Sequence, residues 1–334
     1  MTDRKSALTP STDSPYWRGA VGWEHQGRWW QPWRLLPERV RRAHAPRLVE
    51  VARMPAGVRL QFRTDAAGMQ LPIRSCDEQG GRLDVVVDRD LHLRVDLDPG
   101  TTEVDVPLPS GTHEVQVWLP QAGQIQVGQP RVHEASTCEP LPTGPRWVTY
   151  GSSITQCSAA YGPSQTWPAI VATNLGWDLT CLGYSGQCHL DPIAARTIAA
   201  VPADVITLCL GINIYGTATF NERSFAPHIS GFIEQVREAH PGIPIGVMTP
   251  IVSPDRETTP NPVGQTLVGM RAAIEEVVES LREDDAYLQL IDGLQIFGAD
   301  QVHLLPDQLH PDGQGYQLMG QRLTAELKPL IAAG

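Results

Sequence analysis

Ser153 stands at a point in the sequence where a serine can act as a nucleophile. An apolar run over residues 146–150 ends abruptly in Gly151, Ser152 and Ser153, and a polar loop and a helical pattern follow. This pattern is typical of a buried strand that leads through a loop into a helix. In an open α/β sheet, ligands bind outside the carboxyl ends of the strands. We therefore interpret Ser153 as a candidate nucleophile.

A serine hydroxyl is a weak nucleophile unless a base removes its proton. Asp307 and His310 lie three residues apart in a loop before the last helical stretch. The Asp307 carboxylate could hold one ring nitrogen of His310, which leaves the other nitrogen free to accept the Ser153 proton. Residues Asp300 and His303 repeat the same spacing, so spacing alone does not choose between the two pairs. We favour His310 because it lies just before the helix, where the loop is pinned.

Two further strand ends carry groups that could stabilise an oxyanion. Gly186 follows the second apolar run of this half of the chain, and Asn213 follows the third. The backbone N–H groups of Ser153 and Gly186 and the side-chain amide of Asn213 are the kind of donors that acyl transfer needs for its tetrahedral intermediate. Glycine at position 186 would let the backbone approach the substrate closely.

The elements that must position these residues follow from the hydrophobic pattern. Apolar runs predict strands over 146–150, 179–182, 205–210, 243–248 and 287–291. Helical patterns lie near 165–175, 190–200, 224–240, 262–283 and 313–332. Five apolar strands that alternate with helices predict a parallel sheet covered on both faces, in a doubly wound three-layer α/β/α arrangement.

The first half of the chain has a different pattern. Short strand-like runs occur at 47–52, 58–64, 69–74, 82–87, 92–96, 102–106, 112–119 and 124–133. Their near-regular spacing predicts an antiparallel, jelly-roll-like β-sandwich. We therefore expect a disordered tail over 1–14, a sandwich over 15–137, a Pro-rich linker over 138–145 and a catalytic domain over 146–334.

Five tryptophans between Trp17 and Trp33 could form a sugar-stacking platform or could pack the sandwich. We favour packing, because aromatic residues dominate cores and interfaces alike. A role of this stretch at the cleft, in recognition of an alcohol, is kept as a hypothesis.

Composition narrows the function classes. The 334-residue chain has a net charge of −11, which argues against nucleic acid and anionic membranes as partners. No apolar run is long enough to span a bilayer and the start of the chain shows no signal core, so we expect a cytoplasmic protein. The six cysteines show no paired metal spacing, and we expect neither a metal nor a cofactor. The oligomeric state stays open.

Four segments together resemble the conserved blocks of the SGNH, or GDSL-like, hydrolases: Gly151-Ser-Ser-Ile-Thr155, Gly183-Tyr-Ser-Gly186, Gly211-Ile-Asn213 and Asp307-Gln-Leu-His310. The resemblance covers about residues 146–333, in the order of the family. It implies a flavodoxin-like fold and serine-dependent ester chemistry without a metal. It also implies that Ser153 is the nucleophile, that Ser153, Gly186 and Asn213 form the oxyanion hole, that Asp307 orients and that His310 is the base. The sandwich ahead of this domain is similar to a two-domain subgroup with carbohydrate esterases and some acyltransferases.

The leading hypothesis is an esterase that acts on a small-molecule or carbohydrate ester through an acyl-Ser153 intermediate. Transfer of the acyl group to an alcohol acceptor is the close alternative, because both reactions share that intermediate. A flavodoxin-like flavin-binding protein is a remote alternative, since residues 152–155 after a first strand also resemble a phosphate loop. A non-catalytic binding module built on the sandwich is a further one.

Overall fold

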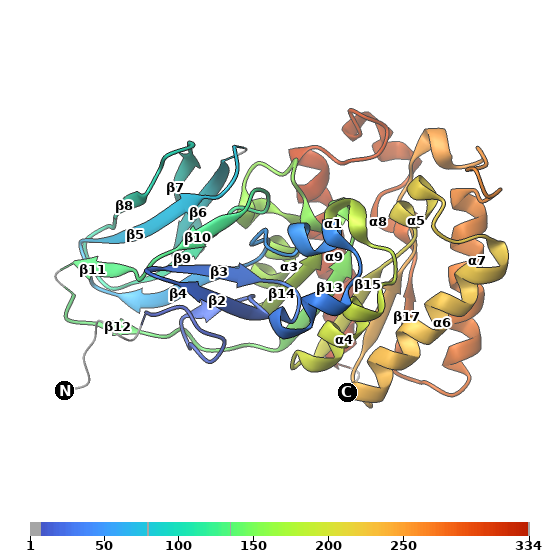
Figure 1. The fold of residues 1–334 in the computed structure, drawn as a ribbon, viewed down its shortest axis with the longest axis horizontal. Coiled ribbons are helices and arrows are strands. Elements are labelled where there is room, and N and C mark those ends of the chain that lie inside the picture. Colours follow the sequence, from blue (N-terminus) through green and yellow to red (C-terminus); the bar gives the residue numbers. More distant parts are fainter. Residues whose placement is uncertain (1–7, 79, 134, 333–334) are drawn as a thin grey trace.

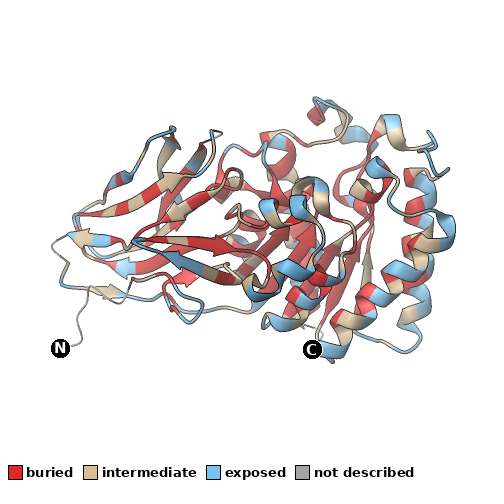
Figure 2. Cartoon of the chain, viewed as in Figure 1, coloured by how far each residue is buried: buried red, intermediate tan, exposed pale blue. Residues whose placement is uncertain are grey.

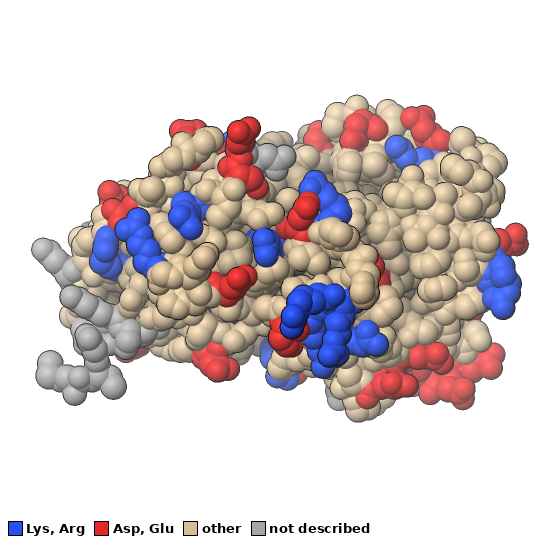
Figure 3. All heavy atoms as spheres, in the orientation of Figure 1, with Lys and Arg blue, Asp and Glu red and all other residues tan. Residues whose placement is uncertain are grey.

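The computed structural model describes residues 8–78, 80–133 and 135–332. Within them the chain forms two antiparallel sheets, followed by one parallel sheet with helices on both faces (Figure 1). Buried residues line the strands of all three sheets, while the outer surfaces of the helices are exposed (Figure 2). In the view of Figure 3, basic side chains gather at the lower centre and acidic ones at the lower right, and no single sign of charge covers the face. None of the described helices is both long enough and apolar enough to cross a membrane.

The antiparallel sheets form the N-terminal half. The first has the order β1 (Trp17–Arg18), β4 (Arg59–Thr64), β9 (His113–Trp118), β6 (Gly81–Val87), β7 (Asp90–Leu97), with β12 (Cys138–Glu139) beside β4. The second has the order β11 (Arg131–His133), β5 (Gly68–Ser75), β10 (Ile125–Val127), β3 (Trp29–Trp33), β2 (Gly22–Gln26), with β8 (Glu103–Pro107) beside β5. Side chains from both sheets, such as Phe62, Leu71 and Val117, are fully buried in one shared core.

Two of the strands expected for this half need correction. The run 47–52 is not a strand but helix α1 (Pro46–Val51), because Pro46 occupies the first helical position, where its missing N–H costs nothing. The run 124–133 is two strands, β10 and β11, separated at Gly128-Gln129-Pro130. A proline cannot donate to a ladder, so the strand is interrupted there.

The expected disordered tail also differs in part. Leu8 is buried in the sandwich core, and its carbonyl oxygen accepts a hydrogen bond of 2.9 Å from the Trp17 indole. Residues 1–7 of that tail lie outside the described residues.

The tryptophan-rich stretch packs within the fold. Trp17, Trp29 and Trp33 are buried. Trp17 meets Trp23 edge to face, and Trp30 stacks on His25. The burial of Trp17, Trp29 and Trp33 agrees with the packing role expected for them.

The second half contains the expected five-stranded parallel sheet. Its order is β14 (Asp178–Gly183), β13 (Arg146–Gly151), β15 (Val205–Cys209), β16 (Ile245–Met248), β17 (Leu288–Ile291), which is the flavodoxin-like order 2-1-3-4-5. Helices α3 (Trp167–Leu175) and α9 (Gly313–Ala332) pack together on one face. Helices α4 (Pro192–Ala200), α6 (Glu222–Ala239) and α7 (Leu267–Arg282) pack in sequence on the other.

A segment from the N-terminal half joins the hydrophobic core of the second half. Leu35, Leu48 and Val51 belong to the same buried cluster as residues of β13, β14 and α6. Fully buried Arg34 lies between the two parts, and its guanidinium donates to the carbonyl oxygens of Val51 and Gly183. The sandwich half and the parallel-sheet half are therefore joined by a common hydrophobic core as well as by the linker.

Candidate active site

The loops that carry the predicted residues meet where the strand order reverses. Strand β13 lies between β14 and β15, so the chain leaves its carboxyl end beside both neighbours. Short helix α2 (Ser153–Gln156) follows β13, the 3₁₀ turn η3 (Ser185–Gln187) follows β14, and α5 (Ile212–Thr217) follows β15. The turn η3 packs against α2. This switch point is where open α/β sheets bind ligands.

Ser153 is the first residue of α2. Ser152 caps that helix, since its hydroxyl oxygen accepts a hydrogen bond of 3.2 Å from the Ile154 N–H. A side chain at Gly151 would come within 2.1 Å of the Thr155 hydroxyl, so only glycine fits between the strand and the helix. The turn is thus tight, and it holds the partly exposed Ser153 side chain at the end of the sheet.

Ser153, His310 and Asp307 form one hydrogen-bonded chain. The distance from Ser153 Oγ to His310 Nε2 is 2.8 Å, and that from His310 Nδ1 to Asp307 Oδ2 is 2.6 Å. A carboxylate can only accept, so Nδ1 carries the proton and Nε2 is left to accept from the serine hydroxyl. Partial burial of the Asp307 carboxyl is opposed by hydrogen bonds from the His310 ring and from the His310 and Leu309 N–H groups, and together these set its pKa at about 2.

The loop that carries His310 is held by residues that sequence reasoning missed. The Ser253 hydroxyl donates to the Gln308 carbonyl oxygen at 2.6 Å, and the Arg256 guanidinium donates to the same oxygen at 3.2 Å. Gln308 itself has a φ of 61°, which few non-glycine residues adopt. Ser253 and Arg256 lie in the loop after β16, and no spacing pattern links them to His310.

The alternative pair is arranged differently. His303 is exposed on the 3₁₀ helix η5 (Ala299–Leu304), and Asp300 lies in the first turn of that helix. Of the two histidines, it is His310 that reaches Ser153.

The predicted oxyanion donors flank Ser153 on the neighbouring strand ends. The Asn213 side-chain oxygen accepts a hydrogen bond of 3.0 Å from the Cys188 N–H. The NH₂ group of the Asn213 side chain therefore points away from Cys188. Gly186 is exposed, and a Cβ there would meet no atom within 4 Å. The Tyr184 N–H donates to the Gly151 carbonyl oxygen at 2.8 Å and ties the η3 segment to the end of β13.

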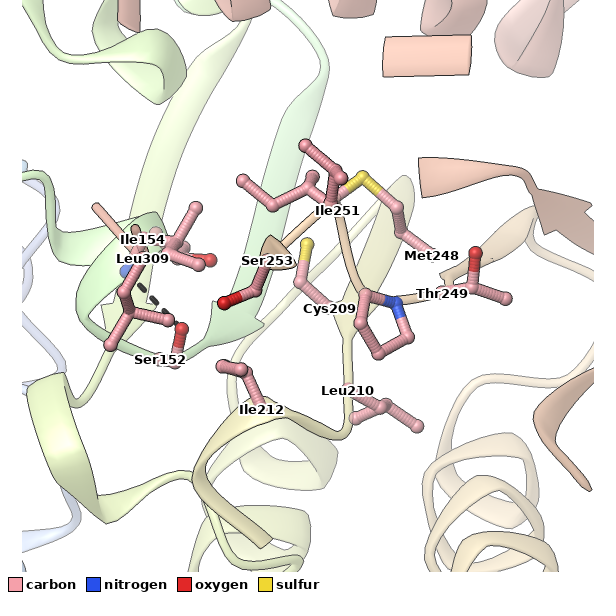
Figure 4. A pocket seen from close by; sticks show the side chains of 13 residues that line it. Ser152, Ile154, Cys209, Leu210, Ile212, Met248, Thr249, Ile251, Ser253 and Leu309 are labelled. Atoms are coloured by element: carbon pink, nitrogen blue, oxygen red, sulfur yellow. Dashed lines mark hydrogen bonds between the residues drawn. The ribbon is translucent and has the colours of Figure 1, made fainter. Parts of the chain in front are cut away.

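A narrow apolar pocket opens beside these residues (Figure 4). Its walls include the immediate neighbours of three predicted site residues, namely Ser152, Ile212 and Leu309. Figure 4 shows Ser152 and Leu309 on one side and Met248 on the other. The free volume is about 20 Å³, little more than one water-sized group requires.

The lining of this pocket is neutral. Cys209 contributes its side chain, and burial raises the pKa of its thiol to about 12, so the sulfur stays protonated. The remaining walls include Met248, Pro250 and Ile251. None of the five tryptophans from Trp17 to Trp33, all within the described residues, lines the pocket.

Family models match both halves of the chain. A model of the GDSL-like Lipase/Acylhydrolase family matches residues 149–318, and a model of the SsfX3 N-terminal domain matches residues 16–127. A search of the curated proteins finds no match.

Several solved structures are similar. The salicylyl-acyltransferase SsfX3 from a tetracycline biosynthetic pathway is 28% identical, with a TM-score of 0.86 over 98% of this chain and 99% of that chain. A candidate GDSL-like lipase from Bacteroides ovatus is 20% identical, with a TM-score of 0.76 over 95% of each chain. A family two carbohydrate esterase from Clostridium thermocellum is 20% identical, with a TM-score of 0.63 over 83% of this chain and 93% of that chain. The last two similarities show the fold alone.

Proposed function

Because the chain belongs to the GDSL-like lipase/acylhydrolase family, we propose that it is a serine esterase that works through an acyl-Ser153 intermediate. The observation that carries this proposal is the continuous contact from Ser153 Oγ through His310 to the Asp307 carboxylate. This is the arrangement that activates a serine hydroxyl without a metal.

The proposed reaction has two halves. Ser153 Oγ attacks the carbonyl carbon of the ester while His310 Nε2 takes the hydroxyl proton. The N–H groups of Ser153 and Gly186 and the amide of Asn213 stabilise the resulting oxyanion. His310 then gives its proton to the leaving alcohol, and the acyl group stays on Ser153. In the second half, His310 Nε2 removes a proton from water as the water oxygen attacks the acyl carbon. The bond from that carbon to Ser153 Oγ then breaks, His310 returns the proton to Ser153 Oγ, and the carboxylic acid is released. Asp307 holds the histidine ring throughout.

The apolar pocket supports a short acyl group. Its neutral lining offers no partner for a charge, and its free volume of about 20 Å³ accommodates roughly one or two carbon atoms beyond the carbonyl. Aryl acetate and propionate are therefore expected to react faster than the octanoate. A preference for the octanoate would contradict this part of the proposal.

Transfer to an alcohol is the second candidate. It is supported by the similarity to the salicylyl-acyltransferase over nearly the full length of both chains, the sandwich included. In that reaction an acceptor hydroxyl replaces water in the second half, and His310 removes its proton instead.

The first experiment is labelling with a fluorophosphonate, with the adduct located by mass spectrometry. The wild type is expected to be labelled at Ser153 and to hydrolyse an aryl acetate. Ser153→Ala is expected to lose labelling and to lower kcat by about 10⁴-fold or more. Ser158→Ala, at an exposed position five residues along, is the matched control and is expected to behave as the wild type. Full activity of Ser153→Ala would show that Ser153 is not the nucleophile.

The second experiment separates hydrolysis from transfer. Product partition is measured while the concentrations of candidate alcohols are raised at a fixed ester concentration. A rising share of new ester, with total turnover maintained, indicates a bound acceptor. Release of the free acid alone supports the esterase.

A further inference from the structure

We propose that His189, Thr219 and Thr217 form a hydrogen-bonded brace that positions the two oxyanion donors outside the nucleophile loop. This inference rests on the proposed function, because it concerns how Gly186 and Asn213 are held. None of the three brace residues belongs to the triad. His189 follows η3, whereas Thr217 is the last residue of α5 and Thr219 lies just beyond that helix.

The brace begins at Gly186 and ends at Asn213. His189 Nε2 lies 3.0 Å from the Gly186 carbonyl oxygen, and His189 Nδ1 lies 2.8 Å from the Thr219 hydroxyl. The Thr219 hydroxyl is 2.7 Å from that of Thr217. The Thr217 hydroxyl in turn donates to the Asn213 carbonyl oxygen at 3.0 Å. This row of contacts therefore joins the backbone of one predicted oxyanion donor to the backbone of the other.

Each end of the brace acts on a group that must be aimed. A hydrogen bond to the Gly186 carbonyl oxygen fixes the peptide plane that follows Gly186 and restricts rotation of this exposed turn. At the other end, the bond to the Asn213 carbonyl oxygen adds to the Cys188 N–H bond that already orients the Asn213 side chain. Oxyanion donors act through geometry set before the reaction, so restraint of both loops favours the transition state.

The brace needs one hydrogen atom in each of its four contacts. Its four contacts end on two carbonyl oxygens, which only accept. The two threonine hydroxyls supply two hydrogen atoms, so His189 must supply both of the others. All four contacts are hydrogen bonds only when both ring nitrogens of His189 are protonated.

The test removes the Thr219 hydroxyl from the brace. Thr219→Val keeps the shape of the side chain but breaks the link between His189 and Thr217. We expect kcat for an aryl acetate to fall about 3- to 10-fold with KM unchanged, a fraction of the 10²- to 10³-fold loss typical of deleting a whole oxyanion donor. The rate of fluorophosphonate labelling should fall in parallel. Thr219→Ser, which restores the hydroxyl, should recover most of the loss.

The control is Thr102→Val, the same change at an exposed position on the sandwich, and it is expected to leave both rates unchanged. If the wild type is active and Thr219→Val has the same kcat, the brace is overturned while the proposed function stands. A rise in KM with constant kcat also overturns it, since that result indicates substrate binding rather than positioning. A wild type that neither hydrolyses the ester nor is labelled at Ser153 overturns the proposed function, and the positioning role with it.

Discussion

At the scale of single residues, the two Asp-x-x-His segments give a direct comparison. His310 contacts both Ser153 and Asp307, whereas His303 is exposed on η5. His310→Ala is therefore expected to lower kcat by about 10⁴-fold or more, because the general base is lost. His303→Ala is the matched control and should remain within about twofold of the wild type. Steady-state hydrolysis of an aryl acetate measures both, and a severe loss in His303→Ala alone would reverse the assignment.

Gly186 offers a second test at this scale. A methyl group at this position would meet no protein atom within 4 Å, and the residue does not adopt the positive φ that only glycine tolerates well. Gly186→Ala is thus expected to leave the melting temperature within about 1 °C of the wild type, yet to lower kcat/KM by roughly 10-fold or more, because the methyl group occupies space meant for the substrate. Unchanged kinetics would show that the substrate does not approach Gly186.

The depressed pKa of Asp307 predicts how its contribution to stability depends on pH. Folding lowers this pKa from the ordinary 3.8 to about 2, so the ionised form is the one that folding favours. The contribution is fully present above about pH 4 and is lost as the pH falls toward 2. Asp307→Asn is expected to lower the melting temperature at pH 6, by a small amount because the carboxylate is half exposed, and the difference should shrink by pH 3. A difference that grows on acidification would contradict this.

What the sequence predicts at residue scale depends on local signals. Ser153, Gly186 and Asn213 each follow the end of an apolar run, and the Asp307–His310 spacing lies within one turn, so all could be proposed from the chain alone. Ser253 and His189 could not. Each acts through a contact whose partner is distant in sequence or lies on another loop, and neither has a spacing rule that points to it.

At the scale of elements, the turn after the nucleophile helix is anchored by the sandwich. Fully buried Asp84 of β6 receives two hydrogen bonds from Arg94 of β7, and its Oδ2 atom also accepts from the N–H and the hydroxyl of Ser164. Gly162 fits here because a Cβ would lie 2.3 Å from the Arg94 guanidinium. The sandwich thus holds the segment that leads from α2 to α3.

Loss of this anchor should be costly. Asp84→Ala leaves the Arg94 guanidinium and the Ser164 hydroxyl without their acceptor, and we expect the free energy of unfolding to fall by roughly 2–4 kcal/mol. Glu114→Ala, which breaks the exposed pair between Arg63 and Glu114, should cost less than about 1 kcal/mol. Urea unfolding measures both, and equal losses would show that the buried anchor has no special role.

The elements themselves were largely predictable where the hydrophobic period was clear. All five strands of the parallel sheet lie within two residues of their expected bounds, because fully buried strands give continuous apolar runs. The errors fell in the first half. The segment 47–52 alternates too weakly to distinguish a strand from a one-and-a-half-turn helix, and Pro46, just outside it, decides the outcome.

At the scale of the whole molecule, Arg34 joins the two halves. Its guanidinium donates to the carbonyl oxygens of Val51 and Met54 on one side and to that of Gly183 and the Gln156 side chain on the other. Arg34→Ala is expected to lower the free energy of unfolding by about 3 kcal/mol or more, because several buried acceptors lose their donor. Arg34→Lys should recover little, since an ammonium cannot reproduce the planar fork.

The control for this prediction is Arg28→Ala at an exposed position, which should change the free energy of unfolding by less than about 1 kcal/mol.

Tryptophan fluorescence and far-UV circular dichroism should report one coincident unfolding transition for the wild type, because the halves share a core. Two separate transitions would show that they unfold independently.

The position of Arg34 also limits how this chain can be recombined with a relative. A chimera joined at the Pro-rich segment 138–145 would take Arg34 from one parent and the carbonyl acceptor at Gly183, together with the packing around it, from the other. The crossover that keeps these partners together is a double one. It exchanges only the strands between about residues 58 and 133 and leaves the segment up to Met54 with its own hydrolase half. Asp84 and Ser164 then come from different parents, so both parents must carry this pair. Libraries that shuffle sandwiches between relatives should therefore place both junctions inside the N-terminal half, although the sequence suggests the linker as the natural boundary.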